Sequence, residues 1–599
     1  MNRLLSVLLS IVALTACQPQ SNAPAGRVEP EAAPGQAAQT EHTSEKSWAV
    51  FVNDYLEASL EAHPAWAVFQ GRHEFDGRLP DWSRAGIEAE IDRLKRARAT
   101  AQGYTDADLT ARQRFERDYF IARLDHDMFW MDTVRWPFRN PIYYLGWMSD
   151  SLDPSPYITL NYAPPAERLR AFTAYLKNLP PAAAQIQANL EMPMPATWLE
   201  FGIDAFTGYA TYFRDEAPAA WAAVEDQELL RTYAAANAEA VAAMQSLAEW
   251  LKGERDAATG DFALGPDLYR RMLWETERVD APLSELEAIA RADLKRNQQA
   301  LADACRTYAP GTDLRACFAK MAANKPAGGA VEAARRQLGE LKAFLLDADL
   351  VSIPGTEEAL VAEAPPYARS NFAYINIPGP WEKNQPSVYN IAPPNPAWPP
   401  QVQADYIPGE ADLLATSIHE VWPGHFLNFL HANRASWIFG RAYVGYAFAE
   451  GWAHYTEEMM LDAGLRHGDP EARIGQIANA LLRNARFLSS LGLHTQGWTV
   501  DDARRFFIEQ GFQDEGNAIQ QAARGTYDLA YLNYNMGKLM IMRLRDDWTA
   551  SRGGRAAWKA FHDAFLSYGG PPIPLVRQAM MQENKPITAF PEFLQNSAD

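Results

Sequence analysis

Two histidines and two glutamates stand close together in one stretch of the chain, and these residue types bind and use catalytic zinc. His419, Glu420 and His425 lie in one apolar segment, and Glu450 begins the run EGWAHYTEE in the next. Nowhere else does the sequence place two histidines and two carboxylates so close together on helix-like segments. Catalytic zinc takes three nitrogen or oxygen ligands and keeps one position for water. The stretch therefore predicts a zinc hydrolase site.

The spacing of the two histidines departs from the familiar H-E-x-x-H arrangement, in which both ligands share one face of a helix. His419 and His425 are six residues apart, so a regular helix would point them roughly 120° away from each other. Pro423 lacks the N–H that continues a helix, and Gly424 tolerates a distorted backbone. We therefore predict that the helix breaks at these two residues, and that the break returns His425 to the face of His419.

The other residues of the stretch have expected roles in such a site. Glu450 is the predicted third ligand, with His454 as a rival on the same helical face. Glu457 also shares that face and is predicted to orient a histidine by hydrogen bonding. Glu420 would act as the general base toward a zinc-activated water.

Hydrolysis of an amide also needs a hydrogen-bond donor for the tetrahedral oxyanion. A predicted helix over residues 526–548 carries several tyrosines. Tyr534 is our first choice for the donor and Tyr531 the second. From the residues alone, an ordinary core tyrosine stays an open alternative.

These motifs resemble the bacterial DUF885 family and its HExxPGH signature. The run His-Glu-Val-Trp-Pro-Gly-His carries the resemblance, together with Glu-Gly-Trp-Ala-x-Tyr-x-Glu and the segments 71–83 and 534–538, so that it extends over about residues 46–547. That family is similar to gluzincin metallopeptidases of the M32 carboxypeptidase and M3 oligopeptidase type, which are mostly helical with a deep cleft. The resemblance implies a set of metal ligands, a base and cleft residues, namely His419, His425 and Glu450 for zinc, Glu420 as base, and Tyr534, Arg486, His494 and Lys538 in the cleft.

The N-terminus has the pattern of a lipoprotein signal. A basic start and the short apolar run Leu4–Leu14 precede Leu-Thr-Ala-Cys, which resembles a lipobox with cleavage before Cys17. We expect a signal peptide over residues 1–16, a disordered tether over 17–45 and one catalytic domain over 46–599. The expected location is the cell envelope, facing the periplasm, with membrane contact only through lipid on Cys17. An ordinary secretory signal with an incidental cysteine is the alternative.

The two remaining cysteines are predicted to form a structural disulfide. Cys305 and Cys317 flank a turn signal, and an oxidising compartment permits the bond. Two buried free thiols are the alternative.

Composition indicates a globular chain, and the apolar spacing along it indicates a mainly α-helical protein. A net charge of −20 without a basic run argues against a nucleic-acid partner. Apolar spacing predicts many helices, among them two separate ones over 165–179 and 181–192, and the segment 71–81 is predicted to be a surface loop. The expected architecture is a two-lobed helical metallopeptidase-like body around a deep cleft, with a small β-ribbon next to the active site.

The ribbon is predicted from two short β-branched and aromatic runs. Phe372–Ile377 and Ser387–Ile391 are bounded by prolines and would form a hairpin. We expect its edge to pair with an extended substrate, with Tyr389 as a substrate contact. Strands that merely cap the helical body are the alternative.

The sequence thus predicts a zinc-dependent hydrolase that cleaves peptide bonds of short peptides. A zinc amidase for non-standard amides or cell-wall fragments is one alternative. A lipoprotein that binds without catalysis is the other.

Overall fold

The computed structural model describes residues 36–145, 151–364, 369, 372–396 and 398–595. The predicted signal peptide, Cys17 and the tether up to residue 35 lie outside these residues. The helix α1 begins at Gln36, inside the predicted tether, because the Ala-, Gln- and Glu-containing segment before residue 46 favours helix.

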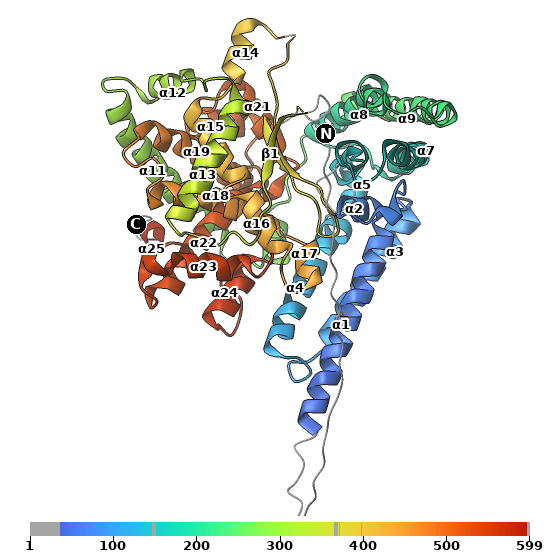
Figure 1. Ribbon diagram of the computed structural model, residues 1–599, viewed down its shortest axis with the longest axis horizontal. Coiled ribbons are helices and arrows are strands. Elements are labelled where there is room, and N and C mark those ends of the chain that lie inside the picture. Colours follow the sequence, from blue (N-terminus) through green and yellow to red (C-terminus); the bar gives the residue numbers. More distant parts are fainter. Residues whose placement is uncertain (1–35, 146–150, 365–368, 370–371, 397, 596–599) are drawn as a thin grey trace, which may run out of the picture.

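The fold is mainly α-helical, as the apolar spacing predicts (Figure 1). The helices of the first half are α1 (Gln36–Ala62), α2 (Pro64–Phe69), α3 (Arg84–Gly103), α4 (Ala111–Met128), α5 (Trp136–Arg139), α6 (Ser155–Thr159), α7 (Pro165–Asn189), α8 (Ala196–Asp215), α9 (Gln227–Gly253), α10 (Pro266–Glu277), α11 (Leu283–Tyr308), α12 (Leu314–Ala323) and α13 (Ala330–Asp347). Those of the second half are α14 (Pro400–Tyr406), α15 (Glu410–Glu420), α16 (His425–Ala432), α17 (Ile438–Ala442), α18 (Tyr446–Ala463), α19 (Pro470–Thr495), α20 (Val500–Glu509), α21 (Glu515–Gly525), α22 (Asn533–Ala550), α23 (Trp558–Leu566), α24 (Ile573–Met581) and α25 (Glu592–Gln595).

Helices that are far apart in sequence lie side by side around the predicted site. In Figure 1, α1, α3, α7, α8 and α9 lie on one side of the sheet, and α11, α13, α15, α19 and α22 lie on the other. On the second side, α19 packs on α11 and α15, and α18 packs on α22. The finer prediction, a two-lobed body around a deep cleft, stays a prediction.

The predicted β-ribbon is present and has one more strand. The strands are β1 (Ala359–Glu363), β2 (Ala373–Asn376) and β3 (Ser387–Ile391), in the order β1-β3-β2. The predicted hairpin is the antiparallel pair β2–β3, while β1 runs parallel to β3. Tyr389 lies in the central strand and is completely buried.

The prediction of two helices separated at residue 180 is wrong. One helix, α7, runs through both Pro180 and Pro181. Its buried face continues across them, with Leu176 and Leu179 before the prolines and Ile186 after them. Burial of that continuous apolar face outweighs the loss of the two N–H donors, since tertiary packing decides most helical stability.

The predicted disulfide is confirmed. Cys305 at the end of α11 is bonded to Cys317 in α12, and both are buried.

Among the helices that the structure describes, none is both long and apolar enough to cross a membrane.

Candidate metal centre

The break predicted between the two histidines is present. Helix α15 ends at Glu420 and α16 begins at His425. The Gly424 N–H donates to the carbonyl of Ile418, six residues back, at 3.0 Å, whereas a regular helix bonds four residues back. This wider turn absorbs the two extra residues, and the ring centroids of His419 and His425 come within 4.8 Å.

Neighbouring helices hold this turn in place. The indole N–H of Trp452 in α18 donates to the Pro423 carbonyl at 2.8 Å. Helix α18 itself packs closely on α22, where a Cβ atom on Gly451 would lie 2.7 Å from the backbone of Gly537. Only glycine permits that approach of the two backbones. The helix that carries Glu450 is therefore fixed both to the turn and to the helix that carries Tyr534.

Three predicted ligands meet in one cluster. Among the described residues, His419, His425 and Glu450 form the group that could hold a metal ion, with ligand atoms within 4.8 Å of one another. Oε2 of Glu450 lies 3.3 Å from Nε2 of each histidine. Ligands at 2.0–2.1 Å from a tetrahedral zinc would be about 3.3–3.4 Å apart, so the donor set and the two distances from Glu450 fit zinc.

The charges of the cluster are arranged to attract a cation. Burial alone would lower the pKa of His419, but Glu450 and Glu457 raise it to about 9. Burial alone would raise the pKa of Glu450, but His425 and His419 hold it well below its usual range. Negative charge therefore faces both histidines in a buried site, where electrostatic interactions are strong.

A fully buried carboxylate stands behind the first histidine, as predicted for Glu457. Its Oε1 lies 2.7 Å from Nδ1 of His419, which leaves Nε2 of that ring to face Glu450. His454, the predicted rival ligand, lies instead on the far side of Glu457, with Nδ1 at 3.3 Å from Oε2. Burial lowers the pKa of His454 to about 4, so this ring is neutral at pH 7.

The predicted base stands next to the ligands. Glu420 is the last residue of α15 and follows His419 directly. Burial raises the pKa of its carboxyl group, while the adjacent His425 and His419 oppose that shift. A carboxylate with a raised pKa is suited to accept and then donate a proton near neutral pH.

The predicted oxyanion donor also lies at the cluster. The ring of Tyr534 is 6.3 Å from that of His419, and its side chain is 8% exposed. Arg486 lies over the same tyrosine ring, with its Cζ atom 4.8 Å from the ring centroid. Burial and then the charge of Glu450 raise the pKa of Tyr534, so its O–H stays protonated and can donate. Tyr531, the second choice, is completely buried.

The other predicted substrate contacts do not line the cavity described below. Lys538 is completely buried and forms an ion pair with Glu458. The Nε2 atom of His494 faces the Gly525 carbonyl at 2.8 Å. Tyr389 is buried in the sheet, and Arg486 donates from Nε to a glutamine at 2.8 Å. Their contact with substrate stays a prediction.

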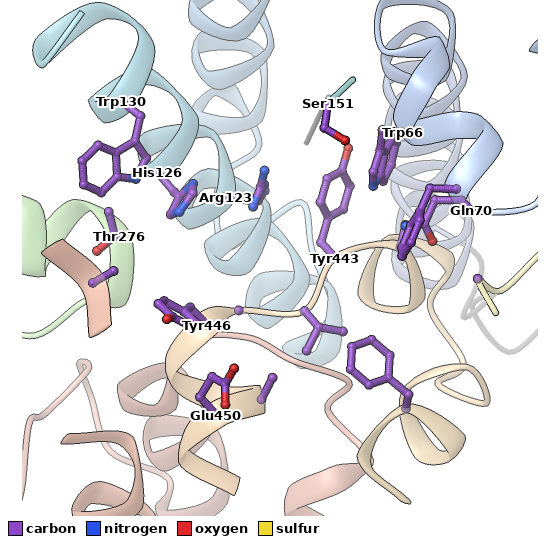
Figure 2. Close-up of a pocket in the computed structure, with 18 of the residues that line it drawn as sticks. Trp66, Gln70, Arg123, His126, Trp130, Ser151, Thr276, Tyr443, Tyr446 and Glu450 are labelled. Atoms are coloured by element: carbon purple, nitrogen blue, oxygen red, sulfur yellow. The ribbon is translucent and has the colours of Figure 1, made fainter. Parts of the chain in front are cut away.

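A cavity of about 470 Å³ opens beside the cluster, and Glu450 lines it. Figure 2 shows Tyr446 and Glu450 on α18 at one side of this space. Arg123 and His126 of α4, and Trp130 in the turn that follows α4, border it on the other side. These lining residues come from widely separated segments, and spacing in the sequence does not reveal them.

The segment 71–81, predicted as a surface loop, is bound to the connection between β2 and β3. His73 lies between two carboxylates, with Nδ1 3.0 Å from Asp76 and Nε2 2.7 Å from Glu382. Its ring stacks on Tyr162 at 3.4 Å between centroids. Burial alone would lower the pKa of His73, but the two carboxylates raise it to about 9. His73 therefore joins both segments as a cation next to the cavity, whose wall includes Gln70.

Comparison with known proteins identifies the family of the chain. The family model described as "Bacterial protein of unknown function (DUF885)" matches residues 64–580, so the chain belongs to this family. No curated protein matches it.

Two solved structures have a similar fold. One is a candidate lipoprotein of unknown function from Shewanella oneidensis, with a TM-score of 0.74, 23% identity, and coverage of 89% of this chain and 99% of that one. The other is a candidate lipoprotein from Colwellia psychrerythraea, with a TM-score of 0.72, 16% identity, and coverage of 92% and 100%. At these identities the likeness shows the fold alone.

Proposed function

We propose that this protein is a zinc-dependent hydrolase that cleaves peptide bonds of short peptides. The observation that supports the proposal is the cluster of His419, His425 and Glu450. Glu450 lies at the spacing of a zinc site from each histidine, and the cluster lies beside a cavity. A cavity of this volume is in the range that small-molecule ligands occupy.

Each residue of the centre has a task in this proposal. His419, His425 and Glu450 would hold the metal, and Glu457 would fix the tautomer of His419 through their hydrogen bond. When bound, zinc would supply a Lewis acid for the water and the scissile carbonyl. Glu420 would take the proton of the water and pass it to the leaving nitrogen.

Tyr534 would stabilise the oxyanion that develops on the scissile carbonyl. Its hydroxyl group stays protonated because burial raises its pKa, and Arg486 over the ring holds the side chain in place. A preorganised donor of this kind contributes most when water is excluded from the site.

We also propose that the chain is a lipoprotein of the cell envelope, facing the periplasm. The support is the lipobox-like sequence before Cys17 and the description of both structural neighbours as candidate lipoproteins. Mass spectrometry of the N-terminal peptide from membranes should find lipid on Cys17. Recovery of an unmodified Cys17 would contradict the anchor.

The test of the hydrolase combines metal analysis with a peptide library. The purified protein should contain about one zinc per chain, and His425→Ala should lose it. Glu420→Gln should keep the zinc and lose roughly 10²- to 10⁴-fold in cleavage rate, because only the base is removed. The matched control is Glu249→Gln, an exposed carboxylate on α9 that should change neither value.

The possible results separate the alternatives. Folded protein without zinc would refute the proposal. Zinc without cleavage of any peptide, but with cleavage of unusual amides, would favour the amidase instead. Product masses from the library would also show which end of a peptide is removed.

A further inference from the structure

Glu277 is a buried acid in the cavity wall that the proposed hydrolysis does not use. Glu277 is the last residue of α10 and lines the cavity. The residue is only 3% exposed. Its Oε1 atom accepts a hydrogen bond from the Ala447 N–H at 3.2 Å and another from the Asn533 amide at 3.0 Å. In the described part of the chain, no cationic side chain pairs with Glu277, and both of its hydrogen bonds are accepted by Oε1.

Two charged groups of the same cavity, Arg123 and Asp528, differ from Glu277 in having a partner of opposite charge. Arg123 is paired with Asp127 at 2.6 Å. Asp528 is paired with Arg524 at 2.7 Å. A buried carboxyl group without a cation is costly, since burial penalises its charged form. Burial indeed raises the pKa of Glu277 to about 8, against the opposing effect of the Ala447 N–H.

Glu277 contacts the helix that carries Glu450 of the candidate metal centre. It bonds to Ala447, and Glu450 follows three residues later on the same helix. The distance along α18 is therefore about one helical turn, or roughly 5 Å. Thr276, its neighbour, also lines the cavity and is labelled in Figure 2.

Capping of the N-terminus of α18 explains the hydrogen bond to Oε1 of Glu277, but it does not explain why the residue is an acid. A helix N-terminus needs an acceptor for its free N–H groups, and Oε1 serves the N–H of Ala447. A neutral side chain such as Gln or Asn could provide the same acceptor without burying an acid. The second oxygen is left for another partner.

We propose that Glu277 binds an ammonium group of the substrate, so that the enzyme acts on short peptides with a free amine about one helical turn from the metal ligands. This inference rests on the proposed function and names its substrate class. The ammonium group can come from the N-terminus of a peptide or from a lysine side chain. A bound cation would supply the ionic partner that Glu277 lacks.

The test measures binding without turnover. Zinc-loaded Glu420→Gln protein is titrated calorimetrically with pairs of short peptides, one member with a free and one with an acetylated N-terminus. A second pair replaces an internal lysine by norleucine. The amine-bearing member of one pair should bind about 10- to 100-fold more tightly, as expected for a charged hydrogen bond. The pair that shows the difference identifies the source of the ammonium group.

Glu277→Gln in the same background keeps the acceptor for Ala447 and removes the negative charge. The preference for the amine should fall below about threefold, while the thermal midpoint stays unchanged. Glu277→Asp should retain part of the preference. Glu275→Gln, two residues earlier on the same helix and outside the cavity wall, is the control that should keep all of it.

Several outcomes would overturn the inference. They are equal binding within both pairs, an undiminished preference in Glu277→Gln, and no measurable binding of any amine-bearing peptide. Because the assay needs no catalysis, a failed hydrolase test with an intact amine preference would refute only the proposed reaction.

Discussion

Replacing Gly424 by alanine should separate the two histidines of the candidate metal centre. A Cβ atom at this position would lie 1.8 Å from the His419 carbonyl oxygen and 2.5 Å from that of Ile418. Both obstacles are backbone atoms of the turn, so no side chain can move aside. The turn itself must open.

The size of the effect follows from these distances. Real Cβ contacts are essentially never shorter than 3.0 Å, so the backbone has to shift by about 1 Å or more, a misplacement that can cost about 100-fold in a preorganised site. His425 directly follows the displaced residue and would move with it. We expect zinc affinity to fall about 100-fold and the free energy of unfolding to fall by about 1–3 kcal/mol, as in overpacked cores.

The assay is competition for zinc between the protein and a chromophoric chelator, with chemical unfolding in parallel. Gly208→Ala is the matched control, because a Cβ there meets nothing within 4 Å and the position is exposed on α8. It should leave zinc affinity unchanged. If Gly424→Ala bound zinc within about threefold of the wild type, the turn would not set the ligand geometry, and our explanation of the six-residue spacing would be wrong.

Three other contacts give measurable expectations. Glu457→Gln weakens the hold on Nδ1 of His419, and chelator competition should show a loss of about 10- to 100-fold in zinc affinity; an unchanged affinity would remove Glu457 from the centre. Cys305→Ser opens a short disulfide loop and should lower the free energy of unfolding by about 2–3 kcal/mol in denaturant titrations, and equal stability of the two proteins would contradict this. His73 has a folded pKa of about 9, above its unfolded value, so its contribution is fully present below about pH 6.5 and lost as pH rises through 9. The stability difference between wild type and His73→Gln should therefore shrink over that interval, and a constant difference would argue against an ionic link.

Local chemistry made most of the candidate metal centre predictable from the sequence. The histidines, Glu420 and Glu450 are identified by residue type and spacing, and Pro423-Gly424 by the backbone freedom that the spacing demands. The helical class and the disulfide were also accessible, because apolar periodicity and cysteine spacing are properties of short segments.

What the sequence did not reveal depends on contacts between distant segments. No local sequence pattern identifies Glu277, because its proposed role depends on its contact with Ala447 and on its position in the cavity wall. The contact of His73 with Glu382 joins residues 309 positions apart. The unbroken helix through Pro180 is a third example, because only the packed core shows why two prolines are tolerated there.

The turn at Pro423-Gly424 also sets the register of the helix that follows. A shortened chain without these two residues would carry an ordinary H-E-x-x-H helix with both histidines on one face. Helix α16 would then continue α15 directly, so its axis would follow that of α15 instead of starting anew at His425. Phe426 and Leu427, which are completely buried, would keep their angle to His425 but would lie on an extended α15, away from their present neighbours. The turn thus separates two requirements that a continuous helix must meet together, the direction of the candidate metal ligands and the direction of the apolar face.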